Sequence, residues 1–397
     1  MSTTTASFTT LPSDFFGFAE QLSAQEKDTL ARLRAFLDEQ VRPRVNDLWE
    51  ASDFPTDLVA PLADLGVLGF GGPETAKFEN SALFRGFVAA ELGRVDAGMS
   101  TFSGVTAGLV MGALRLWASD EQKQQWLHPI AEGRLIGSFG LTEPLSGSDA
   151  ARGLRTTATR DGDTWVLSGE KRWIGNATWA DVVVIIARDT ADSQVKAFVV
   201  PTTTPGYTAT KIEGKYSQRT VQNADIVLDG VVLGEEHRLP GVNSFRDVAN
   251  LLLLTRLDVA WAAVGNAMGA YEAALRYTKE REQFGRPIAS FQLVQSHLVR
   301  ALGDITAALG MCVQSTRMLE AGTQEDHHAA LTKGWVTARA RDAVAHCREI
   351  VGGNGIQIDY DVIRHFADAE ALYSFEGTYE MTTLMVGRAI TGHSAFV

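Results

Sequence analysis

Cysteine is scarce in this chain, and its placement excludes several kinds of site. The 397 residues contain two cysteines, Cys312 and Cys347, which form neither a Cys-x-x-Cys pair nor a metal-ligand spacing. A disulfide framework or a cysteine metal centre is therefore not expected, and both thiols are predicted to be reduced core residues. The adjacent histidines His327 and His328 would point in different directions on a helix, so no metal site is predicted there.

Positive charge is in deficit as well. Lysine and arginine number 36 against 48 aspartates and glutamates, which gives a net charge of −12 at pH 7. This balance argues against nucleic acid and anionic membranes as partners. A phosphate-rich ligand would need a local group of cations. Alternatively, such a group of charges is simply the solvated face of a helix. The densest such group is Arg276, Lys279, Arg281 and Arg286.

Long apolar runs and targeting signals are also missing. No window is expected to approach the apolar length needed to span a bilayer. The run Leu251–Leu254 is followed by Arg256 and Asp258, so it is predicted to begin a buried helix. The first basic residue is Lys27 and the N-terminus has no short apolar region, which argues against a secretory signal or an Arg-rich transit peptide. The last three residues, Ala395-Phe396-Val397, do not form a peroxisomal address. The expected location is cytoplasmic.

The hydrophobic periodicity changes twice, which predicts a mainly α-helical fold with a central β domain. Residues 1–137 are expected to form a helical domain that begins with a capping box from Ser23 to Glu26, with further helices near 79–95 and 119–132. Residues 138–245 carry short β-branched runs, which predict a small antiparallel sheet or barrel with a hairpin at Asp229-Gly230. No Gly-x-Gly-x-x-Gly fingerprint opens a helix, so nicotinamide binding of the Rossmann type is disfavoured.

The helical period returns in residues 246–397, which predict an antiparallel helix bundle. The expected helices cover about 247–282, from an N-cap at Ser290 to about 322, 326–350, 361–373, and from Tyr379 onward. Near the end of this region Glu376 stands beside Gly377 and Thr378. A carboxylate in that setting suits a base held next to a cofactor or an activated substrate. On its own it would more often be solvated surface, because ionised carboxylates are rarely buried without a partner.

Several separated segments carry a family resemblance. They are Leu141–Asp149, Gly169–Asn176, Arg281–Gly285, Phe291-Gln292, Gly352–Gly355 and Phe375–Thr378. In this order and spacing they resemble the acyl-CoA dehydrogenase and oxidase family, closest to its glutaryl-CoA dehydrogenase and peroxisomal short-chain acyl-CoA oxidase branches. The resemblance implies an N-terminal helical domain, a middle β-barrel and a C-terminal four-helix bundle. It also implies noncovalent FAD, an acyl-CoA substrate, a homotetramer, and an electron-transferring flavoprotein as acceptor, or O₂ in an oxidase.

The resemblance assigns roles by position in these motifs. It makes Glu376 the catalytic base. The cofactor contacts that it implies are Phe139, Leu141, Thr142, Ser148, Trp173, Ile174, Gly175, Arg281, Phe284, Gln292, Glu349, Gly352, Gly353 and Thr378, of which Arg281, Phe284 and Gln292 would act across a subunit interface. The substrate contacts that it implies are Ser100, Thr101, Ser148, Arg256, Phe375 and Gly377. For Trp173, a place in the barrel core is the alternative.

The implied reaction is removal of two hydrogens from an acyl thioester to give the trans-2-enoyl-CoA. It needs a base for the α proton and an acceptor for a hydride from the β carbon, and side chains supply no hydride acceptor. The resemblance gives the proton to Glu376 and the hydride to flavin N5. Burial against the flavin and an apolar acyl chain is expected to raise the pKa of Glu376 towards the working pH.

Three departures from the family pattern narrow the substrate and the acceptor. The rival position for the base is occupied by Thr255, which leaves Glu376 as the candidate. Where the glutaryl-CoA branch has an arginine for the distal carboxylate, this chain has Ser100, which favours a simple short-chain acyl-CoA. Gly175 replaces a frequent threonine, which favours access of O₂ to the flavin and keeps the oxidase as an alternative. A flavin monooxygenase is disfavoured by Glu376, and a non-catalytic assembly flavoprotein is the remaining alternative.

Overall fold

The N-terminal region of the computed structural model, which describes residues 7–395, is a layer of helices. Its elements are η1 Phe18–Gln21, α1 Ala24–Phe36, η2 Leu37–Val41, α2 Val45–Ala51, η3 Thr56–Leu58, α3 Val59–Asp64, α4 Ala82–Val95, α5 Ala97–Ser103, η4 Gly104–Val110, α6 Met111–Trp117, α7 Asp120–Gln122, η5 Lys123–Leu127 and α8 His128–Ala131. The predicted capping box is confirmed, because Ser23 Oγ accepts from the Glu26 N–H at 3.3 Å and Glu26 Oε2 accepts from the Ser23 N–H at 2.9 Å. Sequence periodicity missed the run from α5 through the π-helix η4 to α6.

The middle region is a curled sheet. Its elements are β1 Gly137–Gly140, α9 Ala150–Gly153, β2 Thr157–Asp161, β3 Thr164–Gly175, β4 Val182–Asp189, β5 Val195–Pro201, β6 Tyr207–Lys211, β7 Asn223–Gly234 and η6 Glu235–His237. The seven strands run β1-β4-β2-β3-β7-β6, with β5 on the other side of β4. Pairing is mixed, because β4 is parallel to both β1 and β2. The expectation of a purely antiparallel sheet was therefore wrong.

The predicted hairpin at Asp229-Gly230 was also wrong. Both residues lie inside β7, which continues to Gly234 and pairs with β3 on one side and β6 on the other. The register against β3 shifts between Leu167 and Gly169, and Gly230 has a φ of +63°. Asp229-Gly230 thus forms a bulge with a left-handed glycine, because β7 resumes its pairing with β3 directly after it and continues to Gly234.

The C-terminal region is a bundle of long helices. Its elements are α10 Phe245–Glu280, β8 Glu282–Gln283, β9 Arg286–Pro287, η7 Ile288–Ser290, α11 Gln292–Glu320, α12 Asp326–Val351, η8 Gly352–Ile356, η9 Ile358–Tyr360, α13 Val362–Ser374 and α14 Tyr379–Thr391. Ser290 is not the N-cap of α11, since it ends a 3₁₀ turn and its hydroxyl donates to Pro287 O at 2.7 Å. With these three regions in place, the fold class predicted from the sequence is confirmed.

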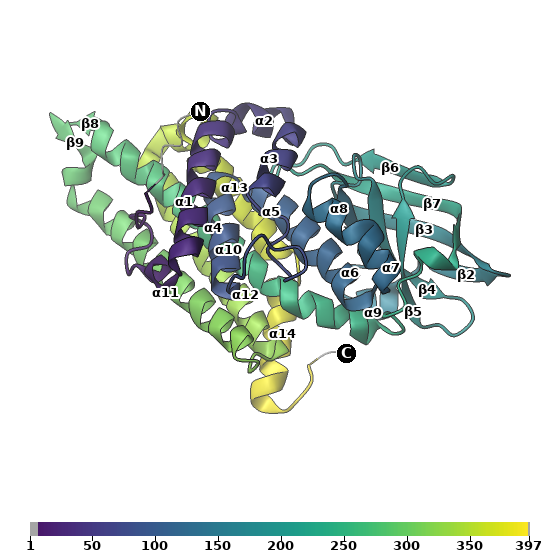
Figure 1. Cartoon of the computed structure of the whole chain (residues 1–397). Coiled ribbons are helices and arrows are strands. Elements are labelled where there is room, and N and C mark those ends of the chain that lie inside the picture. The colour runs from purple at the N-terminus through teal and green to yellow at the C-terminus, as the bar shows by residue number, and fades with distance from the viewer. Residues whose placement is uncertain (1–6, 396–397) are drawn as a thin grey trace.

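The helical regions share one core, and the sheet stands at one end of the molecule (Figure 1). Helix α4 and helix α10 pack with their backbones in contact, since a Cβ at Gly265 would clash with the carbonyl of Ala90. A second cluster joins η4, α6 and α8 to one face of the sheet, and a third lies within its curl. Cys312 and Cys347 are fully buried, as predicted. The site described below lies where these three regions meet.

Two helical stretches are long and apolar enough to cross a membrane by length and composition. They are Ala97–Trp117 and Phe245–Glu280, with mean hydropathies of 1.3 and 1.4. The expectation that no window reaches this level was wrong. In the structure 56% and 61% of these windows are buried against other elements, as in the core helices of a soluble domain.

Candidate active site

Glu376 lies on the short loop between α13 and α14 in a strained backbone conformation. Its φ is +55°, and that of Gly377 is +94°. The left-handed region costs a non-glycine residue on the order of 1–3 kcal/mol, and residues that adopt it cluster at active sites. Thr378 fixes the far end of the loop as the N-cap of α14, its Oγ1 accepting from the Met381 N–H at 3.3 Å.

Lys333 of α12 holds this loop from the interior. Its Nζ donates to the carbonyl oxygens of Tyr373 and Gly377, both at 2.8 Å, and the residue is completely buried. Burial lowers the pKa of Lys333 to about 7, while the neighbouring charge of Glu376 acts in the opposite direction. The cation thus both anchors the loop and lies close to its carboxylate.

Helix α10 presents two further groups to Glu376. Thr255 Oγ1 lies 3.4 Å from Glu376 Oε1, and its single proton is shared between this carboxylate and the carbonyls of Leu251 and Leu252, at 3.5 and 3.4 Å. The residue at the rival base position can therefore act as a hydrogen-bond donor to Glu376. Arg256 forms an ion pair with Asp326, and its Nε has no hydrogen-bond partner among residues 7–395. Burial raises the pKa of Glu376, and Arg256, Thr255 and Lys333 each oppose the rise. A half-buried carboxyl with a raised pKa is suited to act as a base near neutral pH.

The π-helix η4 connects this carboxylate to the middle region. A Cβ built at Gly175, the last residue of β3, would lie 3.8 Å from Val105 Cγ2 of η4. A Cβ at Gly108, three residues further along η4, would lie 3.5 Å from Thr255 Cγ2. Gly175, η4 and the face of α10 that carries Thr255 therefore form one lining that leads to Glu376. Such π-helical segments frequently occur at functional sites.

Trp173 is the most exposed aromatic residue among the predicted flavin contacts of the middle region. It is 50% exposed with a φ of +65°, which excludes the alternative of a core residue. The Arg172 guanidinium lies 5.0 Å from the Trp173 ring centroid, and Asn223 Nδ2 donates to the Trp173 carbonyl at 3.0 Å. Among the other predicted contacts, Phe139, Ile174 and Gly175 are buried, Leu141 and Thr142 are half-buried, and Ser148 is exposed.

A buried ion pair fixes the loop that follows β1. Lys171 Nζ donates to Glu143 Oε1 at 2.8 Å and to the Leu141 carbonyl at 3.1 Å. Glu143 also accepts from the N–H groups of Arg155 and Thr156, at 2.7 and 2.9 Å. Burial lowers the pKa of Lys171 to about 8, and Glu143 opposes that shift. The pair therefore holds Leu141 and its neighbours against the sheet.

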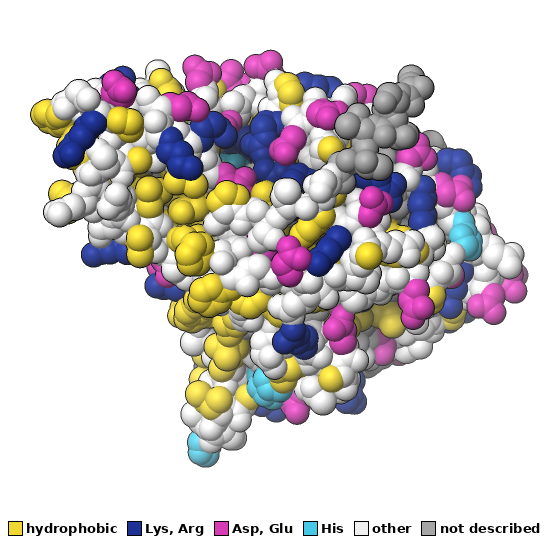
Figure 2. Space-filling model, turned by 60° about the vertical axis from the view of Figure 1, so that its left-hand side comes forward, with side chains coloured by type: hydrophobic (Ala, Val, Ile, Leu, Met, Phe, Trp, Pro, Cys, Tyr) yellow, Lys and Arg dark blue, Asp and Glu magenta, His cyan; other side chains and the backbone are white. Residues whose placement is uncertain are grey.

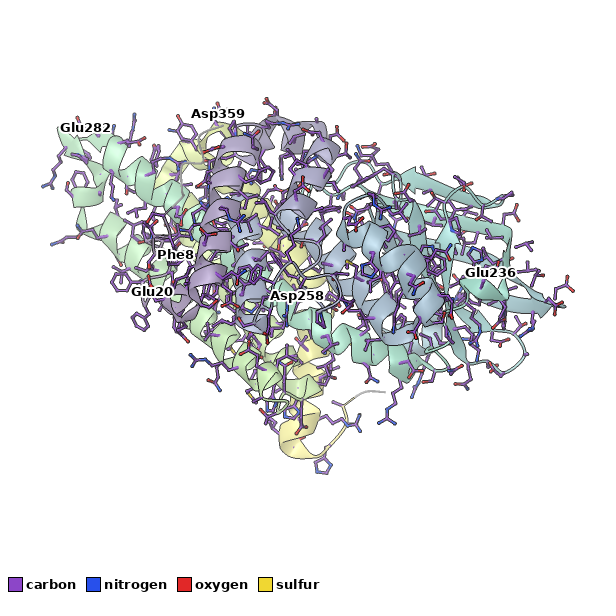
Figure 3. All side chains as sticks on the ribbon, in the orientation of Figure 1. Phe8, Glu20, Glu236, Asp258, Glu282 and Asp359 are labelled. Carbon is purple, nitrogen blue, oxygen red and sulfur yellow. The ribbon has the colours of Figure 1, made fainter. Side chains whose placement is uncertain are left out.

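A second set of predicted cofactor contacts lies at the opposite end of the molecule from the sheet. It comprises Arg281, Phe284 and Gln292 around the β8–β9 hairpin, and Glu349, Gly352 and Gly353 at the end of α12. Figure 3 shows Glu282 of β8 at one end and Glu236, just after β7, at the other. Phe284 is 93% exposed, with a φ of +54°. One copy of the chain therefore does not bring both sets to the same ligand.

The predicted substrate contacts from the N-terminal region are occupied within the protein. The Ser100 hydroxyl donates to the Ala89 carbonyl at 3.0 Å, and Ser100 is 4% exposed. The Thr101 hydroxyl donates to Gln218 Oε1 at 2.7 Å. Phe375 is half-buried beside Glu376. The structure thus gathers Arg256, Phe375 and Gly377 around Glu376, and the assigned roles of all these residues stay predictions.

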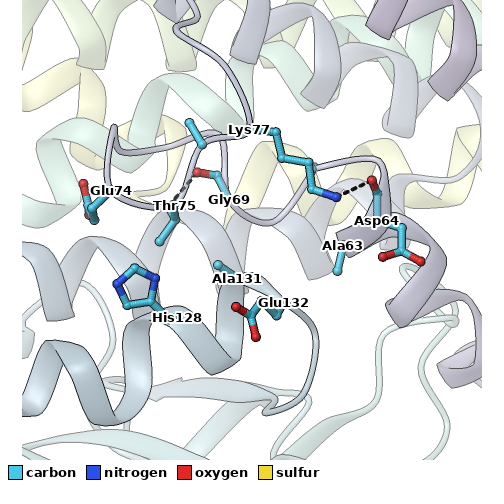
Figure 4. A pocket seen from close by; sticks show the side chains of 11 residues that line it. Ala63, Asp64, Gly69, Glu74, Thr75, Lys77, His128, Ala131 and Glu132 are labelled. Carbon is cyan, nitrogen blue, oxygen red and sulfur yellow. Dashed lines mark hydrogen bonds between the residues drawn. The ribbon is translucent and has the colours of Figure 1, made fainter.

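A surface hollow of about 290 Å³ lies away from this site (Figure 4). Its lining includes Thr75, Lys77 and His128, and Lys77 Nζ donates to the Asp64 carbonyl at 2.5 Å. The predicted site residues do not line it. Its walls come from the N-terminal region alone, so it adds no group to the surroundings of Glu376.

Sequence reasoning missed groups that only become neighbours on folding. Lys333 gave no signal beyond a charge within a helical pattern. His297 of α11 and His346 of α12 place their Nδ1 atoms 3.1 Å apart, and with Glu349 they offer metal-ligand atoms within 4.8 Å of one another. From the sequence, only the adjacent pair His327 and His328 was considered as a metal site.

Three family models together match most of the chain. The acyl-CoA dehydrogenase N-terminal domain matches residues 23–134, the middle domain 138–231 and the C-terminal domain 245–391. This architecture, with a carboxylate between the bundle and the sheet, defines a flavoprotein dehydrogenase of the CH–CH class. The chain belongs to the acyl-CoA dehydrogenase family.

Individual relatives agree with this assignment. A probable acyl-CoA dehydrogenase, YngJ, of Bacillus subtilis is 31% identical over 93% of this chain and 99% of its own length. The mitochondrial short-chain specific acyl-CoA dehydrogenase of Rattus norvegicus is 30% identical over 89% of this chain and 87% of its own. A crystal structure of a glutaryl-CoA dehydrogenase from Mycobacterium smegmatis in complex with FADH2 superimposes with a TM-score of 0.94 at 34% identity, covering 98% of this chain and all of that one.

Proposed function

We propose that the protein is an FAD-dependent dehydrogenase that converts a short-chain acyl-CoA to its trans-2-enoyl-CoA, with Glu376 as the base for the α proton. The observation that carries the proposal is the strained, anchored loop that presents this half-buried carboxyl to Thr255 and to the lining formed by η4. Thr255 contacts the carboxyl and Lys333 holds its loop, while Arg256 favours the ionised form of the carboxyl.

The residues of the middle region fit a flavin. An aromatic ring left half exposed beside an arginine, as at Trp173, offers a flat apolar wall that a ring system would cover. Leu141, Thr142 and Ser148 would contact the same group from the loop that the Lys171–Glu143 pair fixes. When bound, FAD supplies the hydride acceptor that side chains do not provide.

Anaerobic bleaching of the flavin absorbance tests this proposal. Butyryl-CoA and longer and shorter acyl-CoAs are mixed with the holoprotein without an electron acceptor, and the rate and extent of bleaching are measured. We expect fast bleaching by a short-chain substrate and formation of the enoyl-CoA product. A holoprotein that no member of the panel reduces would contradict the proposed function.

Glutaryl-CoA is the second candidate substrate, because a glutaryl-CoA dehydrogenase shares the fold closely. Against it, Ser100 supplies no cation, and its hydroxyl already donates to Ala89 O. We therefore expect glutaryl-CoA to bleach the flavin much more slowly than butyryl-CoA. Fast bleaching by glutaryl-CoA alone would reverse the order of the two candidates.

The acceptor is proposed to be an electron-transferring flavoprotein, with O₂ as the alternative. A Cβ at Gly175 would make only ordinary contacts, the nearest at 3.5 Å to Val221 Cγ1, so the site has room for a larger side chain. If O₂ reaches the flavin through this space, Gly175→Ala should lower the yield of H₂O₂ per turnover without loss of flavin. Peroxide formation and turnover with the flavoprotein are measured side by side, and an absence of peroxide during wild-type turnover would exclude the oxidase.

A homotetramer is proposed because the second set of cofactor contacts faces away from the first. Figure 2 shows a band of apolar side chains on the same side of the molecule, and Phe284, Leu293 and Val299 are 93%, 79% and 69% exposed. We expect Phe284→Ser to weaken assembly and FAD retention together, because both depend on a neighbouring copy. Size-exclusion chromatography with light scattering and the flavin-to-protein ratio measure the two effects. Tyr216→Ser, at an exposed residue of the middle region, is the control.

Lys171→Met is expected to destabilise the fold and weaken FAD binding. It leaves Glu143 buried without its cation, and removal of one partner from a buried ion pair costs about 3–5 kcal/mol. The melting temperature and the FAD dissociation constant report the change. Lys211→Met should leave both nearly unchanged, because Lys211 is partly exposed and its partner Glu213, at 3.7 Å, is well exposed.

The cytoplasmic location of the protein stays a prediction.

A further inference from the structure

Asp258 lies on the same face of α10 as Thr255, one turn further from the base. The axial rise between them is about 4.5 Å, because an α-helix advances 1.5 Å per residue. A Cβ built at Gly108 of η4 would lie 3.2 Å from Asp258 Oδ2 and 3.5 Å from Thr255 Cγ2. Figure 3 shows Asp258 in the middle of the molecule. The lining that leads to Glu376 thus continues beyond Thr255 to a second carboxyl.

This carboxyl has no hydrogen bond or ion pair within residues 7–395, although protein surrounds it and solvent reaches it only in part. The charged groups that act on it are Arg85 of α4 and Glu376. Arg85 directs Nη1 to Asn80, at 3.4 Å from its carbonyl oxygen and 3.1 Å from Oδ1. Burial raises the pKa of Asp258 to about 7, with Glu376 adding to the rise and Arg85 opposing it.

Asp258 is half-buried, and it does not belong to the fully buried side chains that lack a hydrogen-bond partner within residues 7–395. Its oxygens therefore face an open space, and a ligand that fills this space would have to replace the water there with hydrogen bonds of its own. Gly108 supports this interpretation from the facing element, since any side chain there would enter the space in front of Asp258 Oδ2. Thr255, which lies 3.4 Å from Glu376 Oε1, comes between the base and Asp258 along α10. An acyl chain that extends past Thr255 would therefore bring its far part to this space.

We propose that Asp258 sets the acyl specificity of this site, by hydrogen bonding to a neutral hydroxyl or amide group carried a few carbons beyond the β carbon. The inference rests on the proposed acyl-CoA dehydrogenase function. A plain alkyl chain would displace water from the carboxyl and leave it unpaired, which disfavours such a substrate. A terminal carboxylate would add a like charge beside Asp258 and Glu376.

The test compares 5-hydroxypentanoyl-CoA, pentanoyl-CoA and glutaryl-CoA in anaerobic bleaching of the wild type, Asp258→Asn and Asp258→Leu. We expect the wild type to prefer the hydroxylated over the plain chain by at least about tenfold in kcat/KM, as a loss of roughly 1.4 kcal/mol implies. Asp258→Leu should reverse this preference, and Asp258→Asn, which keeps the shape and can still hydrogen bond, should retain part of it.

Gly108→Ala provides a second variant from the opposite wall. Its methyl group would approach Asp258 Oδ2 and should reduce the rate with 5-hydroxypentanoyl-CoA more than with butyryl-CoA. Flavin content and melting temperature confirm that each variant is folded. If pentanoyl-CoA or butyryl-CoA reduces the wild type but the preference is the same in wild type and Asp258→Leu, the specificity role is wrong and the proposed function stands. If no acyl-CoA reduces the wild type, the proposed function fails first.

Discussion

Glu376→Gln is expected to retain FAD and lose most of the rate of flavin reduction. A positioned general base contributes about 10²–10⁴-fold, and glutamine keeps the shape of the side chain without a proton-accepting charge. Thr255 occupies the rival base position and is itself a donor to Glu376, so no neighbouring carboxylate at that position replaces the lost one. Stopped-flow bleaching by butyryl-CoA measures the loss.

The matched control is Glu380→Gln. Glu380 stands four residues later in the first turn of α14 and is exposed, so its replacement should leave the rate nearly unchanged. Substantial turnover by Glu376→Gln, with Glu380→Gln also active, would mean that the base is another group. A protein that keeps its biological role without turnover would favour the assembly alternative.

The raised pKa of Glu376 also gives the sign of a stability effect. An acid whose pKa is higher in the folded than in the unfolded state stabilises the fold fully below the unfolded value, and the contribution is lost as pH rises through the folded value. Glutamine does not ionise, so Glu376→Gln should melt at a higher temperature than the wild type at pH 8. At pH 4 the two should be nearly equal.

Lys333→Met is expected to lower both activity and stability. It removes the donor to the Tyr373 and Gly377 carbonyls, and hydrogen bonds to a charged group contribute about 1.5–3 kcal/mol each. The loop that carries Glu376 would relax from its left-handed conformation, and a misplacement of about 1 Å can cost roughly 10²-fold in rate. Thermal melting and stopped-flow bleaching measure the two losses.

The pH profile separates this positioning role from a merely structural one. Because Lys333 opposes the rise in the pKa of Glu376, its loss should move the acid limb of the rate to higher pH. If the variant is unstable but its rate of flavin reduction falls at the same acidic pH as that of the wild type, Lys333 has only a structural role. Lys123→Met, at a partly exposed residue paired with Asp120 at 3.9 Å, should change neither the melting temperature nor the limb.

Local signals succeeded where the neighbouring chain alone decides the outcome. The capping box at Ser23 follows from a cap, and the approximate bounds of the C-terminal helices follow from periodicity, although the cap predicted at Ser290 was wrong. The hairpin prediction at Asp229-Gly230 failed, because the same dipeptide suits a hairpin turn and a bulge, and the continued pairing of β7 with β3 decides for the bulge. The two apolar windows were also missed. A helix that is buried in the core can be as apolar as a membrane span, and only the packed structure shows which of its residues are covered.

By itself the sequence determined the order of the three regions and the candidacy of Glu376, because motif residues and their spacing survive without coordinates. Only the tertiary structure decided what surrounds that carboxylate. Thr255 reaches it from 121 positions away in the chain, and Lys333 holds its loop from another helix. The unpaired state of Asp258 is of the same kind, since burial and the absence of a partner are properties of the packed helices and not of any segment read alone.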